Sequence, residues 1–188
     1  MSATTEAHGR PAMPSRYAAS LRVLHWLTAL LILGMFVLGV WIRYGSPKPD
    51  TLAHTLYNLH ESTGVTLWLL VLLRIGLRLA KGAPKLPPDT PGGVRALASL
   101  NQFGLYVLLF VMPVLGFLDA NSAGAPLVWY EAVPVPSPIG KQSDTIAGQF
   151  SDAHWCGALL LFLLLVLHIA GAAYHGFIRR DDVVSRMA

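Results

Sequence analysis

Three of the chain's seven histidines, His154, His168 and His175, lie in one long apolar stretch, residues 151–178. An ionisable side chain inside a membrane span usually has a functional partner, because burying it in hydrocarbon is costly. The 14 residues from His154 to His168 advance about 21 Å along an α-helix and leave the two side chains about 40° apart around it. The spacing therefore predicts two histidines on one helix face, one near each side of a bilayer whose core is about 30 Å thick.

Four apolar runs are long enough to cross a membrane, at about 21–42, 55–80, 96–118 and 152–178. Only 13% of the 188 residues are charged and 54% are hydrophobic, whereas a soluble domain has about 25% charged residues. No small-residue cleavage site follows the first run, so we expect a retained helix rather than a signal peptide. We predict an all-α integral membrane four-helix bundle over residues 16–188, preceded by a disordered cytoplasmic tail at 1–15.

The basic residues predict how the helices are oriented. Cytoplasmic segments carry an excess of Lys and Arg, so both termini are expected on the cytoplasmic side. Because these residues flank apolar runs and form no compact patch, the net charge of +4 does not indicate a nucleic-acid partner. With this orientation eleven basic residues fall inside, namely Arg10, Arg16, Arg22, Arg74, Arg78, Lys81, Lys85, Arg95, Arg179, Arg180 and Arg186, and three outside, namely Arg43, Lys48 and Lys141.

Four histidines form two pairs when they are placed by depth. His25 and His168 lie near the inner side, while His60 and His154 lie near the outer side. Facing helices can hold a cofactor in a bundle core, and two histidines on either side of a flat macrocycle form a bis-His haem, which suits electron transfer. The third helix has no histidine and would serve as a wall. Glycines that would leave room for such a group, or simply allow close helix packing, are Gly34, Gly39, Gly64 and Gly171.

Other kinds of site fit the sequence less well. The single cysteine, Cys156, and the lack of any CxxC or CxxCH motif argue against zinc ribbons, iron–sulfur clusters and c-type haem. A bare metal ion needs three or four close ligands, whereas each level offers two histidines. Histidines hydrogen-bonded to neighbouring helices, or a proton relay, remain alternatives. A relay would not account for the 14-residue spacing.

Several motifs resemble the bacterial cytochrome b561 family over roughly residues 16–187: RYAASLRVLHW, NLHESTG, LLRIGLRL, LLFVMPVLGF, and AHW followed by LHIAGAAYH. The resemblance implies a multi-pass protein of the bacterial inner membrane with two b-type haems. It implies that His25 and His168 ligate the cytoplasmic-side haem, and His60 and His154 the periplasmic-side haem. Members are similar to di-haem quinone oxidoreductases, and one branch oxidises superoxide and passes the electron to ubiquinone. Related cytochromes serve as membrane subunits of hydrogenases and formate dehydrogenases.

The resemblance therefore implies an oxidoreductase that moves electrons from a periplasmic donor, such as superoxide, to the ubiquinone pool. The alternative is a haem b membrane-anchor subunit that passes electrons to quinone from a periplasmic dehydrogenase. Superoxide is an anion that positive charge should steer, but the outer side combines its three basic residues with Asp50, Glu61, Asp119, Glu131, Asp144 and Asp152.

The remaining histidines have separate interpretations. The resemblance makes His175 a candidate proton donor to quinone, a role that suits a side chain titrating near neutral pH; contact with lipid headgroups is the alternative. His54 lies about 240° around the helix from His60, so surface exposure is expected. The family has a basic residue in the connector after the second span, where this chain has Asp89, with Lys85 four residues earlier, so the chain departs from the family's basic quinone contact. Arg22, Arg74 and Arg78 could bind haem propionates, although membrane topology is the simpler explanation.

Overall fold

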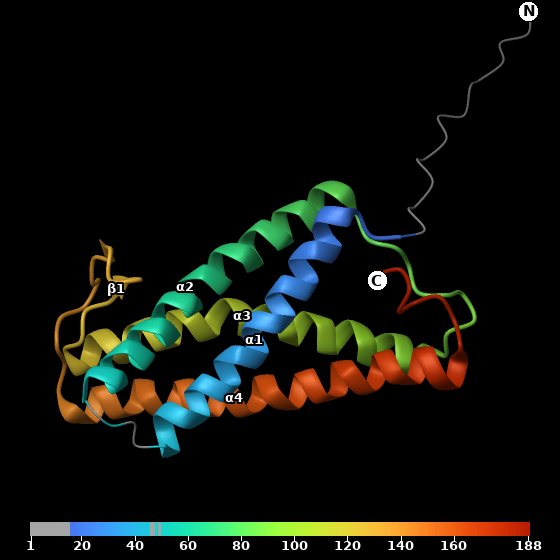
Figure 1. The fold of residues 1–188 in the computed structure, drawn as a ribbon. Helices are drawn as coiled ribbons and strands as arrows, with labels where there is room; N and C mark the ends of the chain where they lie inside the picture. The colour runs from blue at the N-terminus through green and yellow to red at the C-terminus, as the bar shows by residue number, and fades with distance from the viewer. Residues whose placement is uncertain (1–15, 46–47, 49) are drawn as a thin grey trace, which may run out of the picture.

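The computed structural model describes residues 16–45, 48 and 50–188, so the predicted tail at 1–15 lies outside the described part. Four long helices confirm the predicted all-α bundle (Figure 1), and each is long and apolar enough to cross a membrane. The last one ends in a π-helical segment, η1. The elements are α1 (Ala19–Tyr44), α2 (Asp50–Lys81), α3 (Gly92–Ala123), α4 (Asp144–Ala173) and η1 (Tyr174–Arg179).

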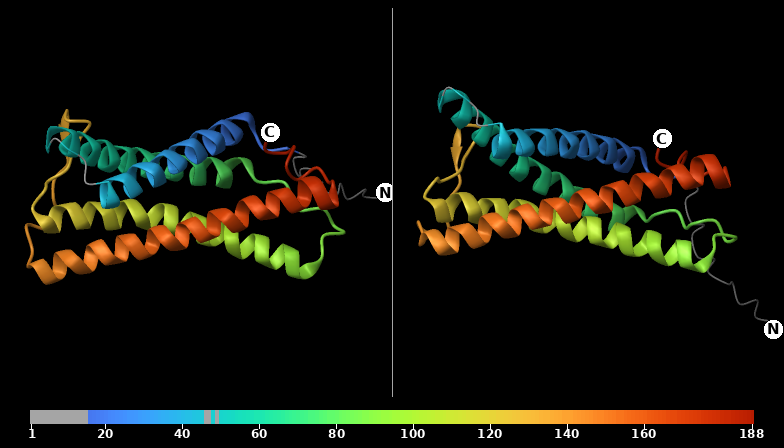
Figure 2. Two further views of the ribbon diagram at one scale, coloured as in Figure 1. Left: turned by 60° about the horizontal axis from the view of Figure 1, so that its bottom comes forward. Right: turned by 90° about the horizontal axis from the view of Figure 1, so that it is seen from below.

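The helices form two layers. α1 packs against α2, α3 packs against α4, and the layers meet where α2 contacts α3, as Figure 2 shows. No Cα atom of α1 or α2 lies within 8 Å of a Cα atom of α4. The space between α4 and the opposite layer is therefore wider than in a closely packed helix pair, whose axes lie about 8–10 Å apart.

The connection between α3 and α4 is shorter than the gap between the apolar runs that end at about 118 and begin at about 152. α3 continues to Ala123 and ends at Gly124, whose φ of 86° places it in the left-handed conformation that caps helices. α4 already begins at Asp144, where the hydroxyl of Ser143 accepts a hydrogen bond from the N–H of Ile146. Between them a small antiparallel hairpin pairs β1 (Val128–Trp129) with β2 (Val133–Pro134). We call this end of the bundle the hairpin end.

Both described ends of the chain lie together at the opposite end of the bundle, here called the termini end (Figure 1). The Arg16 guanidinium donates to the carbonyl of Ser185 at 3.0 Å, and the Trp26 indole N–H donates to the carbonyl of Met187, also at 3.0 Å. These bonds fasten the segment after α4 to the start of α1.

Candidate functional site

The structure brings the four predicted histidines together as two facing pairs. The ring centres of His25 on α1 and His168 on α4 are 6.1 Å apart, at the level nearer the termini end. The ring centres of His60 on α2 and His154 on α4 are 6.2 Å apart, at the level nearer the hairpin end. Both pairs cross the space between the two helix layers, so α4 contributes one histidine to each.

The spacing of these rings fits a metal atom held between them. A metal bonded to one nitrogen of each ring would separate the ring centres by roughly 6 Å, since an imidazole–metal bond is about 2.0–2.1 Å for zinc and a ring nitrogen lies about 1 Å from its ring centre. Among the described residues no group of three or more His, Cys, Asp or Glu side chains could hold a metal ion. Two axial ligands are what a haem iron requires, because the macrocycle supplies the other four.

The hairpin-end pair also lacks polar partners of its own. The Nδ1 atoms of His60 and His154 are buried and form no hydrogen bond with the described residues. A buried polar atom without a partner costs about 1–3 kcal/mol, so hydrogen bonding within the protein does not explain why these two histidines are buried. The donor set and the width of the gap therefore fit haem at both levels.

Two glycines give the hairpin-end rings their room. A Cβ atom added at Gly39 on α1 would lie 3.4 Å from Cε1 of His60, and one added at Gly116 on α3 would lie 2.9 Å from Cε1 of His154. Gly39 was among the glycines expected near a cofactor. A Cβ atom added at Gly34 or Gly171, two others of that set, would have no neighbouring atom within 4 Å. Gly116 was missed, although it lies in the LLFVMPVLGF motif. α3 thus helps to position the His154 ring without providing a histidine.

Substituting Gly116 should disturb the hairpin-end pair selectively. We expect Gly116→Ala to push the His154 ring aside at a cost of about 1–3 kcal/mol, typical of overpacking, and so to lower the occupancy of a haem bound between His60 and His154. Gly76→Ala is the matched control, because a Cβ there would meet nothing within 4 Å and alanine favours the helix by about 0.8–1.0 kcal/mol. Haem absorption per chain measures both, and equal haem content in the two variants would contradict the assignment.

The β-hairpin contacts α2 at two residues, one on either side of His60 and each about half a turn away from it. Ser62 is completely buried; its hydroxyl accepts a hydrogen bond from the N–H of Tyr130 at 2.7 Å, and its carbonyl accepts one from the Trp129 indole at 3.2 Å. The amide of Asn58 donates to the carbonyl of Val128 at 2.7 Å. The hairpin is thus held against the helix turn that presents His60.

His54 and His175 lie outside the two pairs. His54 is exposed, 3.8 Å from a carboxylate oxygen of Glu131, as the sequence predicts. His175 lies in η1 and is only 5% exposed. The wider turn of a π-helix re-aims side chains and is often found at functional sites.

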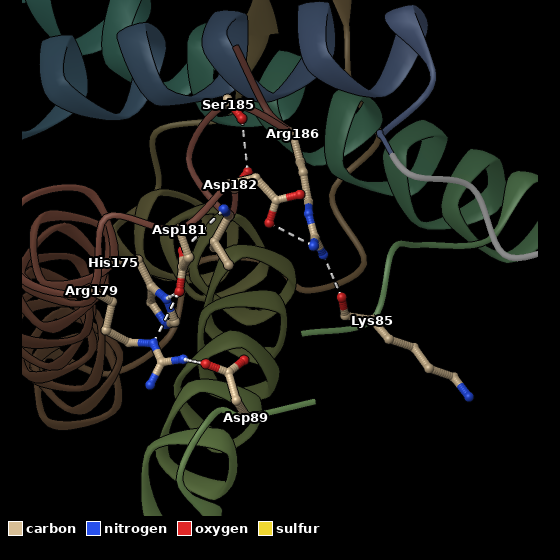
Figure 3. Close-up of polar contacts among 9 residues, drawn as sticks. Lys85, Asp89, His175, Arg179, Asp181, Asp182, Ser185 and Arg186 are labelled. Atoms are coloured by element: carbon tan, nitrogen blue, oxygen red, sulfur yellow. Dashed lines mark hydrogen bonds and ion pairs between the residues drawn. The ribbon is translucent and has the colours of Figure 1, made fainter. Parts of the chain in front are cut away.

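A polar network surrounds His175 (Figure 3). Its Nδ1 lies 2.7 Å from Oδ2 of Asp181, and Nε of Arg179 donates to the same oxygen at 3.0 Å. Arg179 also reaches Asp89 in the α2–α3 connector, at 2.7 Å. Burial raises the pKa of Asp181, but hydrogen bonds from His175, Arg179 and a backbone N–H outweigh it and leave the pKa below its usual value. Asp181 was missed because it lies six residues away, beyond the end of the helix.

Comparisons with known proteins agree with this architecture. The family model described as prokaryotic cytochrome b561 matches residues 16–188. Cytochrome b561 homolog 2 of Escherichia coli (strain K12) is 31% identical over 177 residues, covering 93% of this chain and 92% of the relative. Cytochrome b561 homolog 1 of the same organism is 24% identical, with 92% and 97% covered. A probable superoxide oxidase CybB of Yersinia pestis is 21% identical, with 93% and 97% covered. The chain therefore belongs to the prokaryotic cytochrome b561 family of haem-binding, electron-transferring transmembrane oxidoreductases.

Proposed function

We propose that this chain carries electrons across the bacterial inner membrane with two b-type haems, one bound by His60 and His154 and the other by His25 and His168. The observation that carries the proposal is the separation of 6.2 and 6.1 Å between the facing rings, repeated at two levels of one bundle. A haem b bound by two histidines supplies an iron that gains and loses one electron with no open coordination position.

The termini end would face the cytoplasm. Of the thirteen Lys and Arg residues that the structure describes, it carries ten, and a positively charged end remains on the cytoplasmic side. His25 and His168 would then lie on the cytoplasmic side of the membrane, and His60 and His154 on the periplasmic side.

Ubiquinone is the acceptor that we propose, with His175 as its proton donor. Reducing ubiquinone to ubiquinol takes two electrons and two protons, so the site needs a group that delivers protons near the cytoplasmic-side haem. His175 is buried two turns beyond His168 and is fixed by Asp181. Arg179, held between Asp89 and Asp181, would supply the basic group that the connector itself lacks.

Optical spectroscopy of the purified protein tests the central claim. The reduced-minus-oxidised spectrum should show b-type absorption, and the haem-to-chain ratio should be two. A spectrum without b-type bands, or a single haem per chain, would refute the proposal.

Superoxide is the donor favoured by similarity to the relative named a probable superoxide oxidase. The purified protein should then consume superoxide faster than spontaneous dismutation when ubiquinone is present, and ubiquinol should accumulate. No acceleration over dismutation would exclude superoxide as the donor.

A second candidate function follows from the charge at the hairpin end. Lys48 lies 3.4 Å from Asp50, and the guanidinium of Arg43 lies over the ring of Trp155, so two of the three basic residues there are engaged. Besides Asp50, three carboxylates are exposed, those of Glu131, Asp144 and Asp152. This surface favours a basic periplasmic partner, such as a dehydrogenase subunit that uses the chain as its membrane anchor.

Isolation from native membranes tests this second candidate. A periplasmic redox protein should copurify at low salt and dissociate as salt screens the contact. A chain that always isolates alone would count against the anchor function.

A further inference from the structure

Arg74 is a buried cation in the middle of the cytoplasmic half of α2. Its side chain is only 8% exposed, and six residues of helix separate it from Lys81 at the end of α2. A basic residue that only helps to keep its end of the helix on the cytoplasmic side can lie at the membrane interface, as Lys81 does. Burying a guanidinium costs several kcal/mol unless a counter-charge is present, so the position of Arg74 calls for an anion.

The contacts of Arg74 place it beside the His25–His168 pair. Its Nη1 donates at 3.2 Å to the carbonyl of Leu21 on α1, one turn before His25. Its Nε donates at 3.2 Å to the hydroxyl of Tyr106 on α3. Its charge also interacts electrostatically with both His25 and His168. The guanidinium thus joins three helices at the level of this pair.

Arg78 lies one turn nearer the cytoplasm on the same face of α2. Its Nη2 donates to Oε1 of Gln102 at 3.1 Å, and its guanidinium lies 5.8 Å from the ring centre of Tyr106. Its Nη1 is buried and has no hydrogen-bond partner among the described residues. One donor of this second guanidinium is therefore available to a ligand.

The carboxylates at the termini end are engaged elsewhere. Asp89 and Asp181 pair with Arg179, and Asp182 pairs with Arg186. Among the described residues no Asp or Glu carboxylate lies within 4.0 Å of a side-chain nitrogen of Arg74 or Arg78. Two cations one turn apart thus border a cofactor site without a protein counter-ion.

We infer that Arg74 and Arg78 bind the propionate carboxylates of the haem held by His25 and His168. The inference rests on the proposed function, because it requires a haem at this level. Haem b carries two propionates, and a guanidinium binds a carboxylate through parallel hydrogen bonds. Arg22, the third arginine considered from the sequence, is instead bonded to the carbonyl of Ala188. Arg74 and Arg78 would therefore position this haem and offset its negative charge.

Infrared difference spectroscopy of the holoprotein tests the inference directly. Haem labelled with ¹³C at the propionate carboxyls identifies their bands when the protein is cycled between oxidised and reduced states. We expect Arg74→Gln and Arg78→Gln each to shift these bands and to lower the midpoint potential of one haem, since removing a positive charge favours the oxidised form. Lys81→Gln, on the same helix but exposed, should leave the bands and both potentials as in the wild type.

Two further readouts separate the possible failures. If Arg74→Gln retains too little haem, the test uses Arg78→Gln and Arg74→Lys instead. Arg74→Lys keeps the positive charge, so it should shift the propionate bands while the midpoint potential stays closer to that of the wild type. Unchanged bands and potentials in variants that retain two haems would overturn the arginine assignment and leave the proposed function standing. A wild type without the haem of His25 and His168 would refute the proposed function, and the inference with it.

Discussion

His168→Ala is expected to remove the cytoplasmic-side haem and to spare much of the periplasmic-side haem. His168 faces His25 at a ring-centre distance of 6.1 Å, whereas His154 lies about four helical turns away on the same helix. Losing one of two axial histidines weakens the binding of only the haem that it ligates. The haem-to-chain ratio should therefore fall to half its wild-type value, and the lost spectral component should be the one that ubiquinol reduces first.

His60→Ala tests the periplasmic-side haem in the same way, and His54→Ala is its control. His60→Ala should remove the other spectral component, because His60 faces His154. His54 lies on the same helix six residues earlier but is exposed, so His54→Ala should retain both haems. If His168→Ala and His60→Ala lose the same component, or if either retains both haems with unchanged spectra, the ligand pairs are wrong.

The sequence predicted the histidine pairs because helix geometry leaves little freedom. The rise per residue fixes the depth of His154 and His168 on one helix, and the turn per residue places them on one face. The order of the spans then assigns His25 and His60 to opposite depths. No knowledge of helix packing is needed for either step, which is why the structure places these four side chains as the spacing implies.

The supporting residues could not be predicted in this way, because they depend on how distant segments pack. Gly116 matters only because α3 lies against the His154 ring. Arg74 and Tyr106 are 32 residues apart in the chain. A basic residue near the cytoplasmic end of a span is consistent with topology alone, so charge patterning does not distinguish the buried Arg74 from the exposed Lys81.

The helix ends were mispredicted for a related reason. Apolar periodicity marks the part of a helix that lies in lipid, whereas the hydrogen-bonded helix continues until a capping residue ends it. Gly124 ends α3 and Ser143 begins α4, both outside the apolar runs. The gap between the apolar runs that end at about 118 and begin at about 152 is therefore only partly a loop, and a short hairpin lies in its middle.

The second large effect is expected from Asp181→Asn, which should slow ubiquinone reduction by roughly 10²-fold, the lower end of the 10²–10⁴-fold contribution of a positioned general acid. Asp181 accepts from Nδ1 of His175 at 2.7 Å, so its carboxylate orients the ring and stabilises the positive charge that the ring gains with a proton. Asparagine keeps the shape but presents a neutral amide that can stabilise the wrong ring tautomer. Both haems should remain, and steady-state quinone reduction in liposomes measures the loss.

The pH dependence distinguishes this role from a structural one. The pKa of Asp181 lies below its usual value, with burial opposed by the stronger effect of hydrogen bonds from His175 and Arg179. The stabilisation that the carboxylate provides is therefore complete above the usual aspartate pKa and is lost only as the pH falls through the lowered value. In the wild type a carboxylate consequently faces His175 throughout the physiological range. Without it the imidazolium is less stable, so the pH optimum of quinone reduction in Asp181→Asn should move to lower pH.

Asp182→Asn provides the matched control for this prediction. Asp182 lies on the same tail and pairs with Arg186 at 2.7 Å, but it does not contact His175 and is 59% exposed. Its substitution removes the same charge and loosens the tail, so it should change the rate little and leave the pH optimum in place. His175→Gln should match the loss in Asp181→Asn, and adding Asp181→Asn to it should cause no further decrease, because residues that act as a unit are non-additive. If Asp182→Asn slows quinone reduction as much as Asp181→Asn, the tail has only a structural role and His175 is not the proton donor.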